Sequence, residues 1–145
     1  YLPYIIETSA GLNRMMLAVL VDSYWEDTDN NRTVMKLHPK IAPIKAVICP
    51  LVKKDGLPNI AKKIIDDLKW DFDVAYDEKD AVGRRYRRQD AIGTPYCVTV
   101  DHQTLEDDMV TIRERDSMNQ QRIAIKSLSK ILKSKLSLGE LLKKL

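Results

Sequence analysis

The fold is decided by a short apolar stretch, IKAVICPLV, at residues 44–52. It is bounded by Pro43 and by the polar residues that follow it, and its apolar run is nearly continuous. That pattern is typical of a strand that is buried on both faces of a sheet. Pro58 can open a helix directly afterwards, in which Ile60, Ile64, Ile65 and Leu68 share one side. A buried strand followed by an amphipathic helix is the first unit of an α/β fold.

The same alternation continues along the chain. After the first strand and helix we expect a second strand, a short helix ended by Gly93 and Pro95, a third strand, and then a hairpin around residues 116–119. The order of elements predicts a parallel or mixed sheet that is flanked by helices. The expected elements are DFDVAYD at 71–77, AVGRRYRRQDAIG at 81–93, TPYCVTVD at 94–101, MVTIRER at 109–115 and QQRIAIK at 120–126.

The C-terminal segment SLSKILKSKLSLGELLKKL, residues 127–145, predicts an amphipathic basic helix that Gly139 can bend. One interpretation is that its leucines pack on the domain. The alternatives are a clamp on an RNA backbone or a helix on a membrane surface. The apolar positions of this helix are Leu128, Ile131, Leu132, Leu138, Leu142 and Leu145.

The N-terminal part has a different pattern. Residues 3–8, PYIIET, predict a strand, and the chain then turns at residues 9–11 into a helix whose apolar stripe runs from Leu12 to Trp25. Residues 27–33 predict a polar loop, and residues 33–43 a linker closed by two prolines. We therefore expect two domains, at 1–40 and 41–145. The absence of an initiator Met, with a start inside a strand pattern, suggests a segment of a longer protein whose apolar residues in 1–40 pack on structure outside this sequence.

Composition narrows the class of protein. The chain has 145 residues, 44% of them hydrophobic, which is enough for one ordinary core. No apolar run approaches the roughly 18 residues of a membrane helix, and no basic region precedes the apolar N-terminus as in a signal peptide. We expect a soluble cytoplasmic protein. The net charge of +3 is weak, but residues 84–88, RRYRR, concentrate basic charge as a phosphate-binding surface or a solvated face would.

The cysteines and histidines do not suggest a metal site. Cys49 and Cys97 each lie in a strand-like apolar run, so we expect buried free thiols in a reducing compartment. His38 and His102 stand alone, without the spacing of zinc ligands. No metal-binding residues are predicted.

A first candidate site is ETSAGLNR, residues 7–14, at the expected strand-to-helix junction. Gly11 would let a ligand approach the backbone, and the first N–H groups of the helix favour an anion. Glu7 could accept from an ammonium group, while Arg14 could cover a base or pair with a phosphate. These residue types suit a ligand that carries both an amine and a phosphate. The alternative is a plain helix cap, in which Ser9 satisfies the helix donors.

The stretch PYIIETSAGLNRMMLAVLVDSY, residues 3–24, resembles motif 3 of the class II aminoacyl-tRNA synthetases. Its Glu-x-Ser-x-Gly-x-x-Arg form is similar to the glycyl branch, although Thr8 stands where that family usually has proline. The resemblance implies two groups of binding residues, with Arg14 as the catalytic residue that stabilises phosphate charge. The glycine pocket would comprise Glu7, Thr8, Ser9, Ala10 and Gly11, and ATP would contact Gly11, Leu12, Asn13 and Arg14.

A second candidate site is RRYRRQDAIGTP, residues 84–95, where Arg84, Arg85 and Arg88 are the candidate RNA-binding residues. Tyr86 could stack on an unpaired base. The alternative is a basic helix surface in which Asp90 pairs with Arg87 or another arginine.

Residues 37–55, 82–101 and 111–123 together resemble the anticodon-binding domain of the class IIa synthetases, again in the glycyl branch. The resemblance runs from about residue 4 to residue 132. It implies a mixed five-stranded sheet flanked by about three helices, preceded by a strand-helix remnant of a class II catalytic domain. It also implies that this part of the chain binds the anticodon loop of tRNA-Gly.

The function implied by both resemblances is the ligation of glycine to tRNA-Gly with ATP, through glycyl-adenylate. Mg²⁺ is expected with ATP in the complete enzyme, although no ligands for it are identified in this sequence. The complete enzyme is expected to be a homodimer through a catalytic domain that this sequence lacks, and the fragment alone to be inactive. The alternatives are a non-catalytic, synthetase-like nucleic-acid-binding accessory protein and a purely structural interaction domain.

Overall fold

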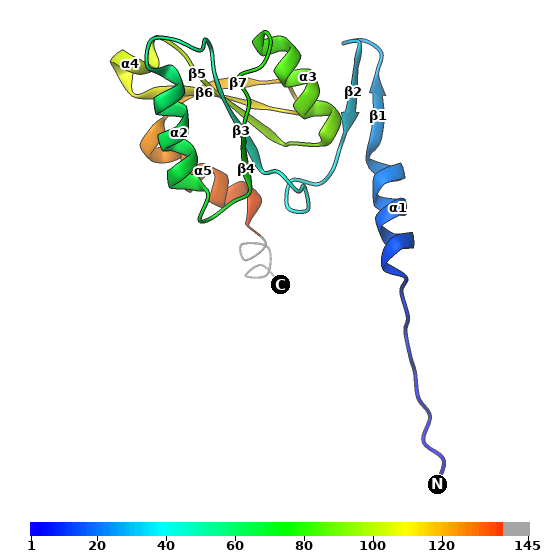
Figure 1. Cartoon of the computed structure of the whole chain (residues 1–145). Helices are drawn as coiled ribbons and strands as arrows, with labels where there is room; N and C mark the ends of the chain where they lie inside the picture. The colour runs from blue at the N-terminus through cyan, green and yellow to red at the C-terminus, as the bar shows by residue number, and fades with distance from the viewer. Residues whose placement is uncertain (138–145) are drawn as a thin grey trace.

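A computed structural model describes residues 1–137, and its centre is a five-stranded sheet with the strand order β4-β3-β5-β6-β7 (Figure 1). Strand β3 is parallel to β4 and β5, whereas β6 runs antiparallel to both β5 and β7. The sheet is mixed because helical crossovers join β3 to β4 and β4 to β5, while a hairpin joins β6 to β7. The predicted α/β fold is confirmed. The strands are β3 Ala46–Pro50, β4 Val74–Tyr76, β5 Tyr96–Val100, β6 Met109–Glu114 and β7 Gln120–Ala124.

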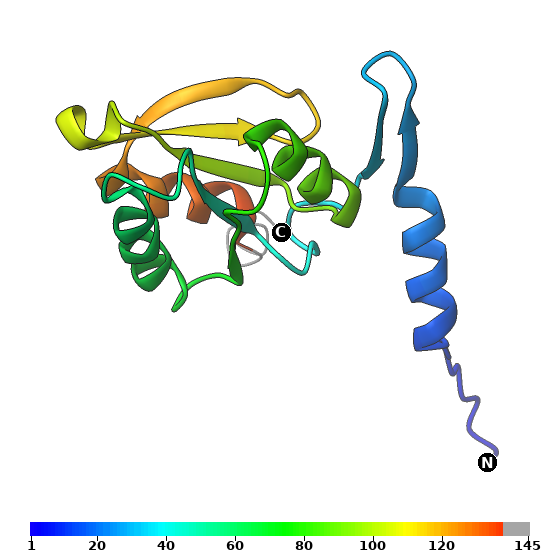
Figure 2. The ribbon, with the colours of Figure 1, turned by 45° about the horizontal axis from the view of Figure 1, so that its top comes forward.

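Helices cover both faces of this sheet. Helices α2 (Leu57–Leu68) and α5 (Ile125–Leu136) lie on one face, and α3 (Val82–Ile92) lies on the other (Figure 2). A single turn, α4 (Thr104–Asp107), follows β5 and was not predicted. The main core lies between the sheet and the first two helices, while a small cluster of Val47, Cys49 and Cys97 faces α3. Every residue of β3 and β5 is buried, as expected for strands between two helical layers.

The ends of the helices follow the predicted signals. Pro58 lies in the first turn of α2, and Gly93 ends α3 with a φ of 89°, a conformation that suits glycine. Leu128, Leu132 and Leu136 of α5 are buried in the core, so packing is the correct interpretation for this part of the C-terminal segment. Leu138, Gly139, Leu142 and Leu145 lie outside the described residues.

The N-terminal region differs from the prediction in two places. Residues 1–11 form no strand, since a strand needs a neighbour for its backbone hydrogen bonds and none of the described residues provides one. Residues 24–35 form a hairpin of β1 (Tyr24–Asp27) and β2 (Arg32–Met35), so the predicted polar loop at 27–33 is only its turn and its flanks. The observed helix is shorter than the predicted one, because Trp25 belongs to β1.

Helix α1 (Leu12–Ser23) and the segment before it extend away from the sheet (Figure 1). The hairpin, by contrast, packs beside α3, so the folded unit includes residues that precede the predicted domain boundary at residue 41. That boundary stays a prediction. No helix within residues 1–137 combines the length and apolar character needed to cross a membrane.

Candidate functional site

The first motif lies where the extended N-terminal segment meets α1. Gly11 precedes the helix with extended backbone, its carbonyl accepts from Met15 N–H at 3.0 Å, and no side chain caps the first turn. The capping alternative for Ser9 is therefore not observed. The first N–H groups of the helix stay open to a ligand, as an anion site requires.

A hollow of about 440 Å³ opens at this junction. Glu7, Thr8 and Ala10 do not line it and lie on the exposed segment before it. The structure thus brings the expected ATP-contacting residues together and leaves most of the expected glycine pocket unassembled, because that segment has no partner strand to hold it. The residues that line the hollow are Ser9, Gly11, Leu12, Asn13 and Arg14.

Arg85 does not suit the predicted contact with RNA. It is 3% exposed, and its guanidinium donates to the backbone carbonyls of Pro50, Glu78, Lys79 and Asp80. A buried guanidinium whose three nitrogens all donate to backbone carbonyls is poorly placed to meet a phosphate. Arg85 instead holds the loop between β4 and α3 against the end of β3, and this corrects the expectation for that residue.

Arg88 has an exposed side chain that is already paired. It lies 2.8 Å from a carboxylate oxygen of Asp77 and 2.9 Å from one of Asp80. The hydrogen bond from Arg88 lowers the pKa of Asp80, and it also lowers the pKa of Asp77 against an opposing effect of burial. Arg84 and Arg87 are exposed on the same helix, and the ion pairs among the described residues do not include them. They are the arginines of α3 best placed to meet a phosphate.

Tyr86 faces the sheet and does not offer its ring to a base. Its hydroxyl shares a 2.7 Å hydrogen bond with Thr99 Oγ1, and the Arg113 guanidinium lies 4.8 Å from the ring centroid. Burial raises the pKa of Tyr86. The predicted stacking role therefore does not fit its position.

Asp90 is fully buried and pairs with arginines, as one alternative predicted, but its partners are not Arg87 or another arginine of α3. It accepts two hydrogen bonds from Arg113, at 2.8 and 2.9 Å, and one from Arg32 at 2.8 Å. Arg32 also donates to Asp27 at 2.7 Å. Residues 32 and 90 are 58 positions apart, so no local pattern signals this pairing. We refer to Asp27, Arg32, Asp90, Arg113 and Arg115 as the buried charge cluster.

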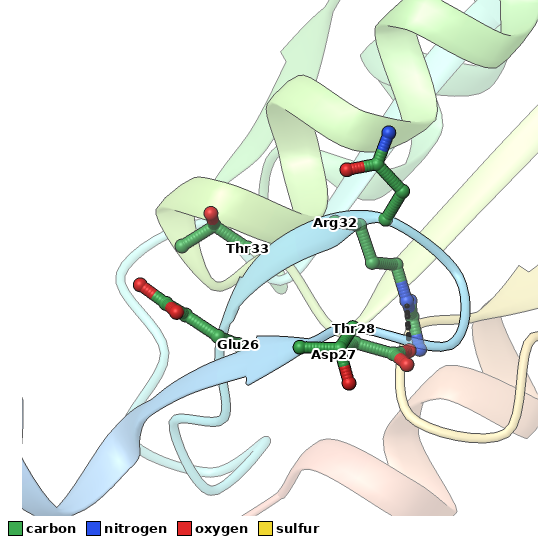
Figure 3. Close-up of a pocket in the computed structure, with 6 residues that line it drawn as sticks. Glu26, Asp27, Thr28, Arg32 and Thr33 are labelled. Carbon is green, nitrogen blue, oxygen red and sulfur yellow. Dashed lines mark hydrogen bonds and ion pairs between the residues drawn. The ribbon is translucent and has the colours of Figure 1, made fainter.

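A second hollow, of about 250 Å³, lies on the hairpin itself (Figure 3). Arg32 and Asp27 are joined to each other there, while Glu26 extends from the neighbouring position of β1 and accepts from the Tyr24 hydroxyl. Because its charged groups are already paired or hydrogen-bonded, this hollow is a weaker candidate site than the one at α1.

The two cysteines are free and buried, as predicted. Burial raises the pKa of the Cys49 thiol to about 12 and also raises that of Cys97. Both are thus packing residues rather than nucleophiles.

The arrangement of the sheet and its helices is shared with solved structures. The sheet and its helices match the RNA binding domain of threonyl-tRNA synthetase from Cryptosporidium parvum Iowa II, with a TM-score of 0.63 and 21% identity, over 70% of this chain and 26% of that one. This likeness shows that the two share a fold. Residues 45–135 match the family described as the anticodon binding domain, and the chain belongs to that family.

The similarity to curated proteins covers more of the chain. A glycine–tRNA ligase of Borreliella burgdorferi is 52% identical over 139 residues, which are 94% of this chain and 31% of the ligase. A glycine–tRNA ligase of Rhodopirellula baltica is 51% identical over 143 residues, 94% of this chain and 27% of the ligase. The chain thus spans less than a third of the length of these relatives.

Proposed function

We propose that this chain is the C-terminal part of a glycine–tRNA ligase, which attaches glycine to tRNA-Gly with ATP through glycyl-adenylate. The observation that carries the proposal is the similarity to glycine–tRNA ligases over 94% of the chain. An alignment of this extent takes in residues on both sides of the predicted domain boundary, whereas the anticodon-binding family covers residues 45–135 alone.

The chemistry of the first motif supports an adenylate site. In the proposed reaction the carboxylate of glycine attacks the α-phosphate of ATP and pyrophosphate leaves. Arg14, beside the open N-terminus of α1, would hold the phosphates and stabilise their developing charge. Glu7 would accept from the ammonium group of glycine once a neighbouring strand fixes the segment before α1. Positioning and electrostatics carry such a reaction, so no acid–base residue is needed.

The second part of the proposal concerns RNA. Arg84 and Arg87, with Arg88 beside them, would meet the phosphates of the tRNA-Gly anticodon stem-loop. Mg²⁺ would arrive with ATP, and no group of three or more potential metal-binding side chains occurs within residues 1–137. The complete ligase would be a homodimer through its catalytic domain, and the 145-residue chain alone would be inactive.

RNA binding is tested by fluorescence anisotropy of the 145-residue chain with tRNA-Gly and with the same tRNA carrying a swapped anticodon. We expect the swap to weaken binding. Arg84→Ala and Arg87→Ala should each weaken binding to both RNAs and reduce the salt dependence by about one counterion. Lys63→Ala, an exposed residue of α2 on the opposite face of the sheet, is the control and should change neither. Equal affinity for both tRNAs would contradict anticodon binding.

Catalysis is tested by glycine-dependent pyrophosphate exchange in the complete ligase that contains this chain. We expect exchange with glycine and ATP, and its loss in the Arg14→Ala variant. The 145-residue chain should show none. A complete protein that binds tRNA and catalyses no exchange would instead be a non-catalytic accessory protein.

A further inference from the structure

The β1–β2 hairpin is attached directly to α1. Helix α1 ends at Ser23 and β1 begins at Tyr24, so no flexible residue separates them. The N–H of Lys36, just after β2, donates to the carbonyl of Ser23 at 2.6 Å, and Ser23 is buried. The end of the helix is thus held by both strands, and the orientation of the hairpin determines the direction of α1.

The hairpin is attached equally firmly to the anticodon-binding domain through the buried charge cluster. Arg32, whose side chain is 4% exposed, reaches from β2 to the Asp90 carboxylate on α3 and to the Arg115 carbonyl, each at 2.8 Å. Arg115 reaches in the opposite direction, donating to the carbonyls of Leu37 and Gly93 at 2.9 Å each. The attachment therefore consists of hydrogen bonds that cross the junction from both sides.

Contacts of this kind select one orientation. A purely apolar contact can slide or rotate at little cost, but a displaced Arg32 or Asp90 would leave a buried charge without its partner. Shape restricts the junction further, since a Cβ on Gly93 would lie 2.9 Å from Leu37 Cδ1 and 3.1 Å from the Met35 carbonyl oxygen. The backbone after β2 and the end of α3 are therefore in close contact.

The two proposed binding sites lie on either side of this junction. The hollow that includes Arg14 is at the far end of α1, and the exposed arginines are on α3, the helix that carries Asp90. We propose that the buried charge cluster fixes the orientation in which one tRNA molecule contacts α3 while its acceptor end reaches the adenylate, which makes Arg32 a positioning residue for glycyl transfer. This inference rests on the proposed function and adds the residue that couples its two halves.

The test uses the complete ligase with Arg32→Met, which removes the guanidinium and leaves Asp90 paired with Arg113. We expect glycine-dependent pyrophosphate exchange and the Kd for tRNA-Gly to stay within about threefold, because neither site contains Arg32. Single-turnover transfer of glycine to tRNA should fall by about tenfold or more, since misplacement by about 1 Å costs a reaction up to a hundredfold in rate. Arg32→Lys, which keeps the charge on a single donor nitrogen, should restore part of the transfer rate.

Arg122→Met is the matched control. Arg122 also joins two carboxylates, at 2.7 Å from Asp101 and 3.0 Å from Asp107, but both belong to the sheet domain and are remote from the hairpin. Its loss should leave glycyl transfer unchanged at temperatures where the enzyme is folded. If Arg122→Met slows transfer as much as Arg32→Met does, the effect is one of general stability and the inference is wrong.

Hydrogen exchange of the 145-residue chain provides a readout that does not depend on activity. With Arg32→Met, exchange should accelerate in residues 24–37 and stay slow in β3. Unchanged hydrogen exchange in the hairpin would overturn the inference. So would an Arg32→Met ligase that loses pyrophosphate exchange and glycyl transfer to the same extent. Absence of glycine-dependent exchange of pyrophosphate in the wild-type enzyme would instead overturn the proposed function, whereas the hairpin measurement would still report on its attachment.

Discussion

Helices α1 and α5 both have 12 residues and are rich in leucine or methionine, yet they have opposite environments. Helix α5 buries Leu128, Leu132 and Leu136 in the core, whereas Ser23 is the one buried residue of α1. Their patterns explain the difference. The apolar residues of α5 form one stripe, and Lys126, Lys130 and Lys133 lie on the opposite side. Helix α1 is apolar on most sides, which is typical of a helix that is enclosed by other structure.

The comparison shows that an apolar pattern predicts burial but does not identify the partner. Leu12, Met16, Leu17 and Val21 are all more than half exposed in this chain. Exposure on this scale is characteristic of a surface that another part of a protein covers. Because the chain spans less than a third of its curated relatives, we infer that residues outside this sequence cover α1 in the proposed ligase.

The largest expected difference is between two alanine substitutions, one at a leucine of each helix. Leu132→Ala should lower the free energy of unfolding of the 145-residue chain by about 2–5 kcal/mol, because it removes a fully buried side chain and leaves a cavity. Leu17→Ala, at a residue that is 62% exposed, should change it by about 0.5 kcal/mol or less. Urea unfolding followed by circular dichroism measures both. Similar losses for the two variants would mean that α1 is buried in solution, for example in a dimer.

Substitutions at two glycines, one within α3 and one at its end, test how closely the hairpin packs against that helix. Gly93→Ala should destabilise the chain by about 1–3 kcal/mol, since its φ is +89° and the new methyl group would contact Leu37 and the Met35 carbonyl. Gly83→Ala is the matched substitution within α3, where nothing lies within 4 Å of the new Cβ, and it should be neutral or stabilise by up to about 1 kcal/mol. Thermal unfolding compares them. A tolerated alanine at position 93 would show that the hairpin is not closely packed there.

The smallest expected effect is a pH dependence of the hairpin. Burial opposes ionisation of Asp27, but the hydrogen bonds from Arg32 and Asn30 outweigh it and hold its pKa below the ordinary value of 3.8. Because the pKa is lower in the folded state, the stabilisation is complete above about pH 4 and is lost as the pH falls through the folded value. Protection of residues 24–35 from hydrogen exchange, measured relative to the intrinsic rate, which itself slows over this range, should therefore decrease as the pH falls from 5 towards 3. Asp27→Asn should flatten this dependence, and an identical profile in that variant would refute the assignment.

The alternation of strands and helices from residue 44 onwards could be predicted because periodicity, Pro58 and Gly93 act locally. The hairpin could not, since YWED and RTVM are short and partly polar, and its stability comes from contacts with α3. The prediction of a strand at residues 3–8 was wrong for a related reason. An extended apolar segment becomes a strand when another strand pairs with it.

The candidate site shows the same difference between features set by local sequence, which could be predicted, and features set by distant contacts, which could not. The nearness of Ser9, Gly11, Asn13 and Arg14 follows from their spacing at a helix start, and the sequence predicts it. The burial of Arg85 could not be foreseen, because four arginines in five positions usually indicate a solvated surface. Its place was decided by carbonyls at the end of β3 and in the loop after β4, which come together only in the folded chain.

The direct junction between Ser23 and Tyr24 restricts how the chain can change in length. One inserted residue there would rotate everything before it by about 100° around the helix axis and advance it by about 1.5 Å. Arg14 would then point in another direction relative to α3. The turn between Asp27 and Arg32 carries no such penalty, because a longer turn leaves both strands in place. Natural insertions and deletions should therefore accumulate at residues 28–31 and be absent at the helix–strand boundary.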